Sequence, residues 1–199
     1  MLWTPSTANG TSGSMVDLGV LSGATSQSLG QAINALGQVA GYSAGSSGSR
    51  AFLWTPAVPN GSTGVMLDLG DLPGGDATGI AWGINSAGWV VGDSSGSNNA
   101  FNSRAFLWTP ATGMIDLNTL LDQAYPGWTL GFARGINDAG QITGDAIYDP
   151  DGPGPISGYP RGFLLTLTEP IQYPSIPEPG AMAIVALVAA MLFRRRGMV

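Results

Sequence analysis

The sequence contains no cysteine, no histidine and no lysine, since all seven of its positive charges are arginines. These absences exclude disulfides, thiolate or imidazole metal ligands, a Ser-His-Asp triad, a cysteine nucleophile and a Schiff-base lysine. Only carboxylates, hydroxyls and a few arginines remain for chemistry, and we expect no cofactor. The lack of cysteine does not decide the redox compartment, because an exported protein need not carry disulfides.

Charge is also scarce, at 10% of residues, and the formal net charge is −6 although three arginines cluster at 194–196. The rest of the chain is therefore strongly acidic and repels phosphate backbones, so we expect no nucleic-acid partner. An acidic, solvated surface that maintains solubility is the simpler interpretation. With 44% hydrophobic residues, 31 glycines and 14 prolines, the composition favours short strands joined by tight turns.

Three short sequence motifs, which we call words, recur along the chain. They are LWTP at Leu2–Pro5, Leu53–Pro56 and Leu107–Pro110; MVDLG, MLDLG and MIDLN ending at Gly19, Gly70 and Asn118; and AINALGQVAG, GINSAGWVVG and GINDAGQITG starting at Ala32, Gly83 and Gly135. The shared asparagine falls at Asn34, Asn85 and Asn137, so the steps are 51 and 52 residues. A fixed period near 50 residues indicates a structural repeat.

Each unit is interpreted as four short strands. In GINSAGWVVGDS a strand reaches Ile84, Asn85 to Gly88 turn, and Trp89–Val91 return, since asparagine caps such a turn and glycine supplies positive φ. In RAFLWTP, Phe52 and Trp54 alternate with apolar neighbours, which predicts a strand covered on both faces and ended by proline. The MLDLG word supplies the fourth strand.

Four antiparallel strands with this period predict an all-β fold, a β-propeller-like array of about three four-stranded blades. A parallel β-solenoid is a weaker alternative because its rungs are usually shorter, and a jelly roll does not require repeated words. Propellers close with roughly four to eight blades, so three cannot form a ring.

The combined words resemble the HAF repeat family of extracellular bacterial repeats, over about Leu2 to Thr168. The resemblance implies a fold and an extracellular location more than a reaction. The repeats then occupy 1–168, in approximate units 1–52, 53–106 and 107–168. Met1 lies inside a repeat, and no charged and apolar signal segment precedes it. We expect the chain to be the C-terminal part of a longer repeat protein, or else to complete its ring by oligomerising.

The C-terminal tail combines three features after a linker at 169–176. Pro177-Glu178-Pro179 is followed by an apolar run, Gly180–Phe193, and then by Arg194, Arg195 and Arg196. As a helix the run spans about 21 Å, short of a bilayer core of about 30 Å, so a buried core helix is the alternative. The isolating linker and basic stop instead favour a temporary membrane hold, with the arginines on the cytoplasmic side.

This tail, 177–199, resembles a PEP-CTERM sorting signal across Ile176 to Gly197. The resemblance implies that exosortase, a membrane protease, recognises the tail and processes it near Pro-Glu-Pro. It also implies a Gram-negative bacterium that makes exopolysaccharide, which is a candidate partner. We expect a protein of the cell envelope or exterior, anchored transiently in the membrane by the C-terminal helix.

Few residues are candidates for chemistry. Asp149 and Asp151 resemble the start of a calcium loop but lack its remaining ligands. The loop with Asp68, Asp71 and Asp76 is a similar candidate. Paired carboxylates suit a glycosidase, yet Asp17, Asp68 and Asp116 recur at one repeat position, which favours a structural role. Arg50, Arg104 and Arg161 recur as well, and we expect them to pair with acids between blades.

We therefore expect a surface or matrix repeat protein that acts as a structural or binding scaffold and is not an enzyme. The alternatives are a carbohydrate-active enzyme, which needs a nonrepeated carboxylate pair in a cleft, and a calcium-stabilised extracellular binding module.

Overall fold

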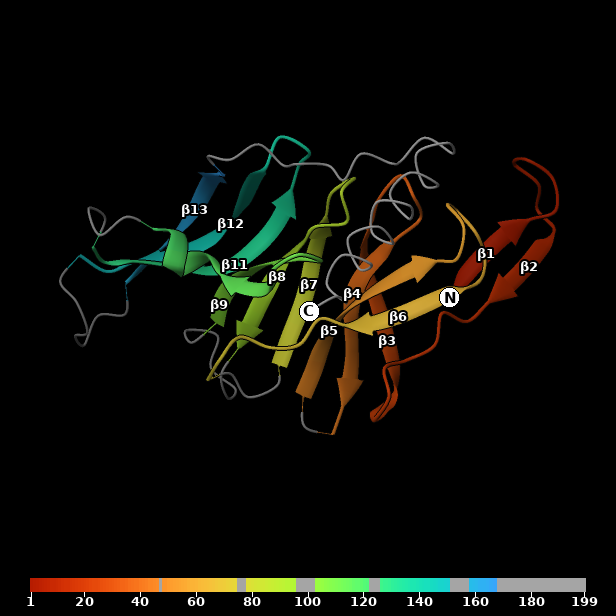
Figure 1. The fold of residues 1–199 in the computed structure, drawn as a ribbon, viewed down its shortest axis with the longest axis horizontal. Helices are drawn as coiled ribbons and strands as arrows, with labels where there is room; N and C mark the ends of the chain where they lie inside the picture. Colours follow the sequence, from red (N-terminus) through yellow and green to blue (C-terminus); the bar gives the residue numbers. More distant parts are fainter. Residues whose placement is uncertain (47, 75–77, 96–102, 122–125, 151–157, 168–199) are drawn as a thin grey trace, which may run out of the picture.

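The computed structural model describes residues 1–46, 48–74, 78–95, 103–121, 126–150 and 158–167. Within them the fold is all-β, with four antiparallel sheets that follow one another along the long axis of the molecule and form no closed barrel (Figure 1). The all-β prediction is confirmed. The C-terminal helix expected at Gly180–Phe193 lies outside the described residues.

The sheets contain consecutive strands in every case. The N-terminal hairpin has β1 (Leu2–Pro5) and β2 (Gly13–Val16); sheet 1 has β3 (Ala24–Ile33), β4 (Val39–Gly45), β5 (Gly48–Pro56) and β6 (Gly64–Asp68); sheet 2 has β7 (Thr78–Ile84), β8 (Val90–Ser95), β9 (Ser103–Thr109) and β10 (Gly113–Asp116); sheet 3 has β11 (Trp128–Ile136), β12 (Gln141–Tyr148) and β13 (Tyr159–Thr166). A 3₁₀ helix, Leu117–Leu120, follows sheet 2.

The predicted hairpin turns are present. Ile84 pairs with Val90, and between them Gly88 adopts a φ of 76° that glycine tolerates without strain. The Asn85 side chain accepts hydrogen bonds from the backbone N–H groups of Ala87 at 3.1 Å and Trp89 at 3.0 Å. The equivalent Asn34 and Asn137 bond their own turns in the same way. The recurring asparagine therefore fixes each turn locally.

The third strand of each complete sheet is buried on both faces, as predicted. We call the two sides the Phe-Trp face, with Phe52 and Trp54 in sheet 1, and the Ala-Leu face, with Ala51 and Leu53. In sheet 2 the corresponding pairs are Phe106 with Trp108 and Ala105 with Leu107.

The sheets stack in one constant order. The Ala-Leu face of sheet 1 shares a core with the Phe-Trp face of sheet 2, and the Ala-Leu face of sheet 2 packs on Leu130, Ala133 and Ile142 of sheet 3. At each junction the first strand of the later sheet lies against the first three strands of the earlier one. Burying large apolar side chains at both junctions is the main source of stability for such an array.

The N-terminal hairpin has the register of a third and fourth strand. Leu2 pairs with Val16 as Leu53 pairs with Leu67, and Trp3 pairs with Met15 as Trp54 pairs with Met66. Its apolar side chains are nevertheless poorly covered, with Trp3 43% and Met15 61% exposed. The hairpin thus corresponds to the third and fourth strands of a complete sheet.

Candidate functional site

The Asp-Leu-Gly words open the loops that connect successive sheets. Asp17 and Asp68 accept hydrogen bonds from the backbone N–H groups two residues on, at 3.0 and 3.1 Å. Further along, Leu21 and Leu72 are buried, and their N–H groups donate to the side-chain hydroxyls of Ser43 at 3.2 Å and Ser94 at 3.4 Å. The two loops are therefore anchored by the same contacts.

The recurring arginines complete these anchors. Arg104 donates to the Asp116 carboxylate at 3.1 Å and to the Pro73 carbonyl at 2.7 Å. Arg50 donates likewise to Asp68 at 2.6 Å and to the carbonyl of Ser22. The ion pairs join adjacent strands within one sheet, so the expectation that they lie between blades was wrong. The arginine meets the acid of its own sheet because the register places the acid opposite the phenylalanine two residues further on, so the two charged side chains are diagonal neighbours on one face.

The recurring asparagines link the sheets to one another. The side-chain amide of Asn34 donates to the carbonyl of Asn85 at 3.0 Å, and that of Asn85 donates to the carbonyl of Asn137 at 3.4 Å. Ser86 adds two bonds to the Asp138 carboxylate, from its N–H at 2.8 Å and its hydroxyl at 2.9 Å. We call this row of turns the asparagine ladder.

A second row lies along the first strands, where a β-bulge recurs in all three sheets. At each bulge one residue of the first strand has no partner in the pairing register. These residues are Gln31, Trp82 and Arg134, and they occupy equivalent positions in the three sheets. The Arg134 guanidinium carbon lies 4.9 Å from the centre of the Trp82 ring and 4.7 Å from that of Phe132, within cation–π range. Sheets 2 and 3 are thus joined at their bulges as well as at their turns.

Two carboxylates belong to this bulge cluster, which comprises Trp82, Asp93, Phe132, Arg134 and Asp145. Asp93 is 3% exposed and accepts from the Trp82 indole at 2.6 Å, while Arg134 donates to Asp145 at 2.9 Å. Burial raises the pKa of Asp93, although hydrogen bonds from Trp82 and Ser95 and the charge of Arg134 favour its ionised form.

The bulge cluster connects sheets 2 and 3 through polar and cation–π contacts. Asp93, the acid of the cluster whose pKa is raised, is buried and bonded to protein donors, and Arg134 already lies over both aromatic rings. Sequence reasoning missed these residues because their types differ among the repeats. The available signal was position, since each bulge residue lies two residues before the Ile-Asn pair of its turn.

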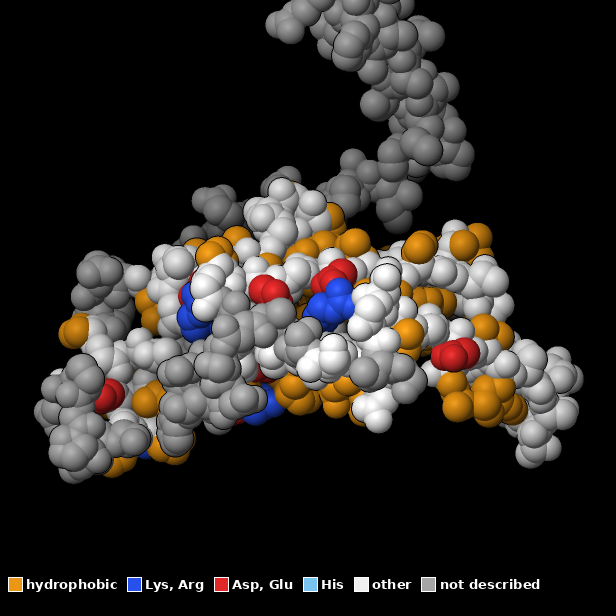
Figure 2. Space-filling view, turned by 90° about the horizontal axis from the view of Figure 1, so that it is seen from below, with side chains coloured by type: hydrophobic (Ala, Val, Ile, Leu, Met, Phe, Trp, Pro, Cys, Tyr) orange, Lys and Arg blue, Asp and Glu red, His pale blue; other side chains and the backbone are white. Residues whose placement is uncertain are grey.

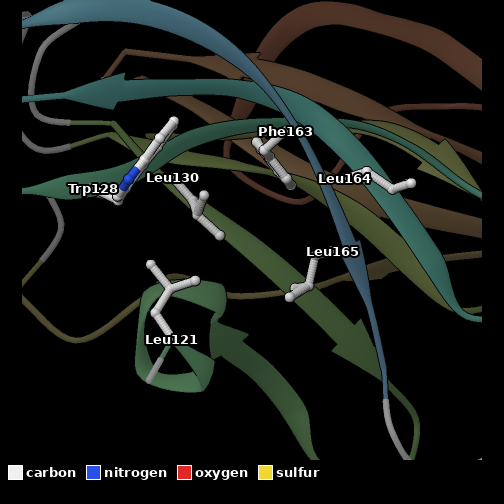
Figure 3. A pocket seen from close by; sticks show the side chains of 6 residues that line it. All are labelled: Leu121, Trp128, Leu130, Phe163, Leu164 and Leu165. Carbon is white, nitrogen blue, oxygen red and sulfur yellow. The ribbon is translucent and has the colours of Figure 1, made fainter. Parts of the chain in front are cut away.

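Several hollows border the stacked sheets, and one of about 710 Å³ beside the N-terminal hairpin includes Met15, Asp17 and Leu29 in its lining. A cavity of about 230 Å³ at β13 is lined by Leu121, Trp128, Leu130, Phe163, Leu164 and Leu165 (Figure 3). One of about 250 Å³ lies over Phe132, Asp145, Ile147 and Pro160, and one of about 330 Å³ beside the N-terminal hairpin includes Leu2, Ile33 and Trp54. On the face in Figure 2 the charged side chains are scattered among apolar and uncharged groups, and the described residues form no large patch of a single charge sign there.

The residues predicted to carry chemistry are only partly described. Asp149 donates its backbone N–H to the Gly127 carbonyl at 2.7 Å. Asp151 and Asp76 lie outside the described residues, as do the residues predicted to form a sorting signal, Pro177, Glu178, Pro179, Arg194, Arg195 and Arg196. Burial, then the charge of Asp68, raises the pKa of Asp71, against the effect of Arg50.

Within the described ranges, no cluster of three or more acidic side chains is placed to hold a metal ion. The same part of the chain contains no helix that is both long and apolar enough to cross a membrane.

In comparisons with known proteins, no family model, no curated protein and no solved structure matches this chain.

Proposed function

We propose that the stacked sheets are blades of a β-propeller-like array that serves as an exported structural or binding scaffold. The observation that carries the proposal is the structural use of the recurring residues, the aspartates within each sheet and the asparagines at both sheet junctions. Asp68 and Asp116 hold arginines, and the asparagines join neighbouring turns. Residues that repeat for architectural reasons are not available as a unique catalytic pair, which favours a scaffold over an enzyme.

The stacking order supports a propeller-like arrangement. Strands β3, β7 and β11 are the first strands of successive sheets, and each contacts the next. Sheets in a propeller are related in this way around a central axis. In this proposal the three described sheets form an open arc of blades.

The sorting tail supports an extracellular site of action. In this proposal exosortase recognises Pro177-Glu178-Pro179, the apolar run 180–193 holds the chain in the membrane, and Arg194–Arg196 stop its passage. Processing releases the array to the cell envelope or exterior of a Gram-negative bacterium, where exopolysaccharide is its candidate partner.

The test is the intact mass of the chain recovered from the surface and culture fractions of a Gram-negative host that has an exosortase. The expected chain ends near Pro177–Pro179, and a variant with Pro177→Ala and Pro179→Ala stays in the membrane fraction unprocessed. Recovery of the unprocessed 20.3 kDa chain only from inside cells would refute the proposal.

A further inference from the structure

Sheet 3 lacks, among the described residues, the fourth strand that completes sheets 1 and 2. In those sheets the fourth strand has two tasks. Met66 and Met114 lie opposite Trp54 and Trp108 and pack against the core, and Asp68 and Asp116 receive the recurring arginines.

Among the described residues, β13 has neither a methionine opposite its apolar face nor an aspartate beside its arginine. Leu165 occupies the position of the tryptophans, and the 230 Å³ cavity lies beside it. Figure 3 shows Phe163 and Leu165 on the side of β13 that faces Leu130 and Leu121, with Leu164 on the other side. A methionine side chain suits such an irregular apolar space.

The arginine of this strand also has no acidic partner among the described residues. Arg161 corresponds to Arg50 and Arg104, but its contacts within the described ranges are the Pro160 carbonyl at 3.0 Å and the Tyr159 ring at 5.5 Å. The edge of β13 thus presents an apolar cavity and an arginine in the register that a Met-x-Asp strand satisfies elsewhere in the chain.

The opposite end of the molecule presents such a strand. β2 carries Met15, 61% exposed, and is followed by Asp17, which is exposed and caps the Gly19 N–H. Its partner β1 has four residues, half the length of β13. Because the N-terminal hairpin and β13 lie at opposite ends of the molecule (Figure 1), one copy cannot join them by itself.

We infer that two copies of this chain associate head to tail, with β2 of one copy pairing with β13 of the other. The known register places Met15 opposite Leu165 and Asp17 opposite Phe163, within reach of Arg161. β13 then takes the place beside β2 that β1 holds in a single copy. The outer edge of β13 has no partner strand among the described residues, and a free strand edge readily accepts a strand from another chain; such a heterologous contact extends the array. This inference is independent of the proposed export and sorting.

The first test uses the absence of cysteine in the full 199-residue chain. Variants Met15→Cys and Leu165→Cys are mixed under mild oxidation, and the expected product is a disulfide-linked pair of chains. The matched control replaces Leu165→Cys with Leu164→Cys, which lies on the other face and is expected to link at least five-fold less. Equal linking by the control, or no linking, would overturn the inference; the latter result is also expected if another segment of the chain occupies β13.

The second test does not depend on buried positions. Asp17→Arg and Arg161→Asp each change an exposed side chain, and sedimentation of each variant alone is expected to show weaker association than the wild-type chain, by about two- to five-fold or more. Mixing the two variants places opposite charges at both contacts between unlike copies, one of them the original Asp17–Arg161 pair, and is expected to restore association. A monomeric wild-type chain at all concentrations, or unchanged association in the single variants, would contradict the inference.

Discussion

Replacing Asn85 with alanine tests whether the asparagine ladder holds the sheets together. The Asn85 side chain is 3% exposed, accepts from Ala87 and Trp89 at 3.1 and 3.0 Å, and donates to the Asn137 carbonyl at 3.4 Å. In Asn85→Ala, the N–H groups of Ala87 and Trp89 lose their acceptor and the Asn137 carbonyl loses a donor. Each buried group left unsatisfied costs about 1–3 kcal/mol, and the longest bond contributes least, so we expect a loss of about 2–4 kcal/mol of unfolding free energy.

Asn137→Ala is the matched control. Asn137 accepts the same two turn bonds, from Ala139 at 3.0 Å and Gln141 at 2.9 Å, but it is exposed, so water replaces the lost acceptor. We expect it to cost about 1 kcal/mol. The difference between the two variants isolates the burial of Asn85 and its bond to the next sheet.

The assay is urea unfolding of both variants at one pH, analysed by linear extrapolation. Tryptophan fluorescence and far-UV circular dichroism are recorded together, because arrays of repeats can unfold in parts. If Asn137→Ala destabilises the chain as much as Asn85→Ala does, the ladder does not stabilise the junction and the reasoning fails.

Three further predictions concern the junctions. Phe106→Ala, at a fully buried position, is expected to cost about 3–5 kcal/mol in urea unfolding, whereas Leu164→Ala, at a 68% exposed position, changes stability by about 0.5 kcal/mol or less. Gly83→Ala places a Cβ 3.0 Å from the Gly135 Cα and is expected to cost about 1–3 kcal/mol, while Gly135→Ala meets only a methyl group at 3.7 Å and is tolerated; similar thermal stabilities for the two would contradict this packing. Because the folded-state pKa of Asp93 is raised, its protonated form favours folding, and that contribution is lost as pH rises from below about 3.9 through the folded pKa. Asp93→Asn should therefore gain stability relative to the wild-type chain over this range, and a pH-independent difference in urea midpoints would refute the assignment.

The local structure was predictable because it depends on neighbouring residues. Asn85 and Gly88 specify their turn within four positions, and the alternation in Ala51–Trp54 specifies a strand with two buried faces. The partners of Arg104 were not predictable in the same way. Its two acceptors lie 12 and 31 residues away, one at the end of β10 and the other on the loop before sheet 2, and only the strand register and the loop path bring them to one guanidinium.

The bulge cluster shows the same limit. Trp82 and Arg134 share no residue type with each other or with Gln31, so self-similarity in the sequence does not mark them. They meet because the bulge recurs in each first strand and those strands lie in contact. A polar contact of this kind depends on the stacking geometry and not on a recurring word.

By itself the sequence determined the repeat, the all-β class, the hairpin turns and the strands with two apolar faces, because backbone preference and side-chain alternation act over a few residues. The tertiary structure decided which face packs on which, that the arginines bind within a sheet, and that Asn34, Asn85 and Asn137 form a row. The asparagine bonds join residues 51 and 52 positions apart and the arginine bonds join residues 12 to 31 positions apart, so these contacts exist only once the strands have paired and the sheets have stacked.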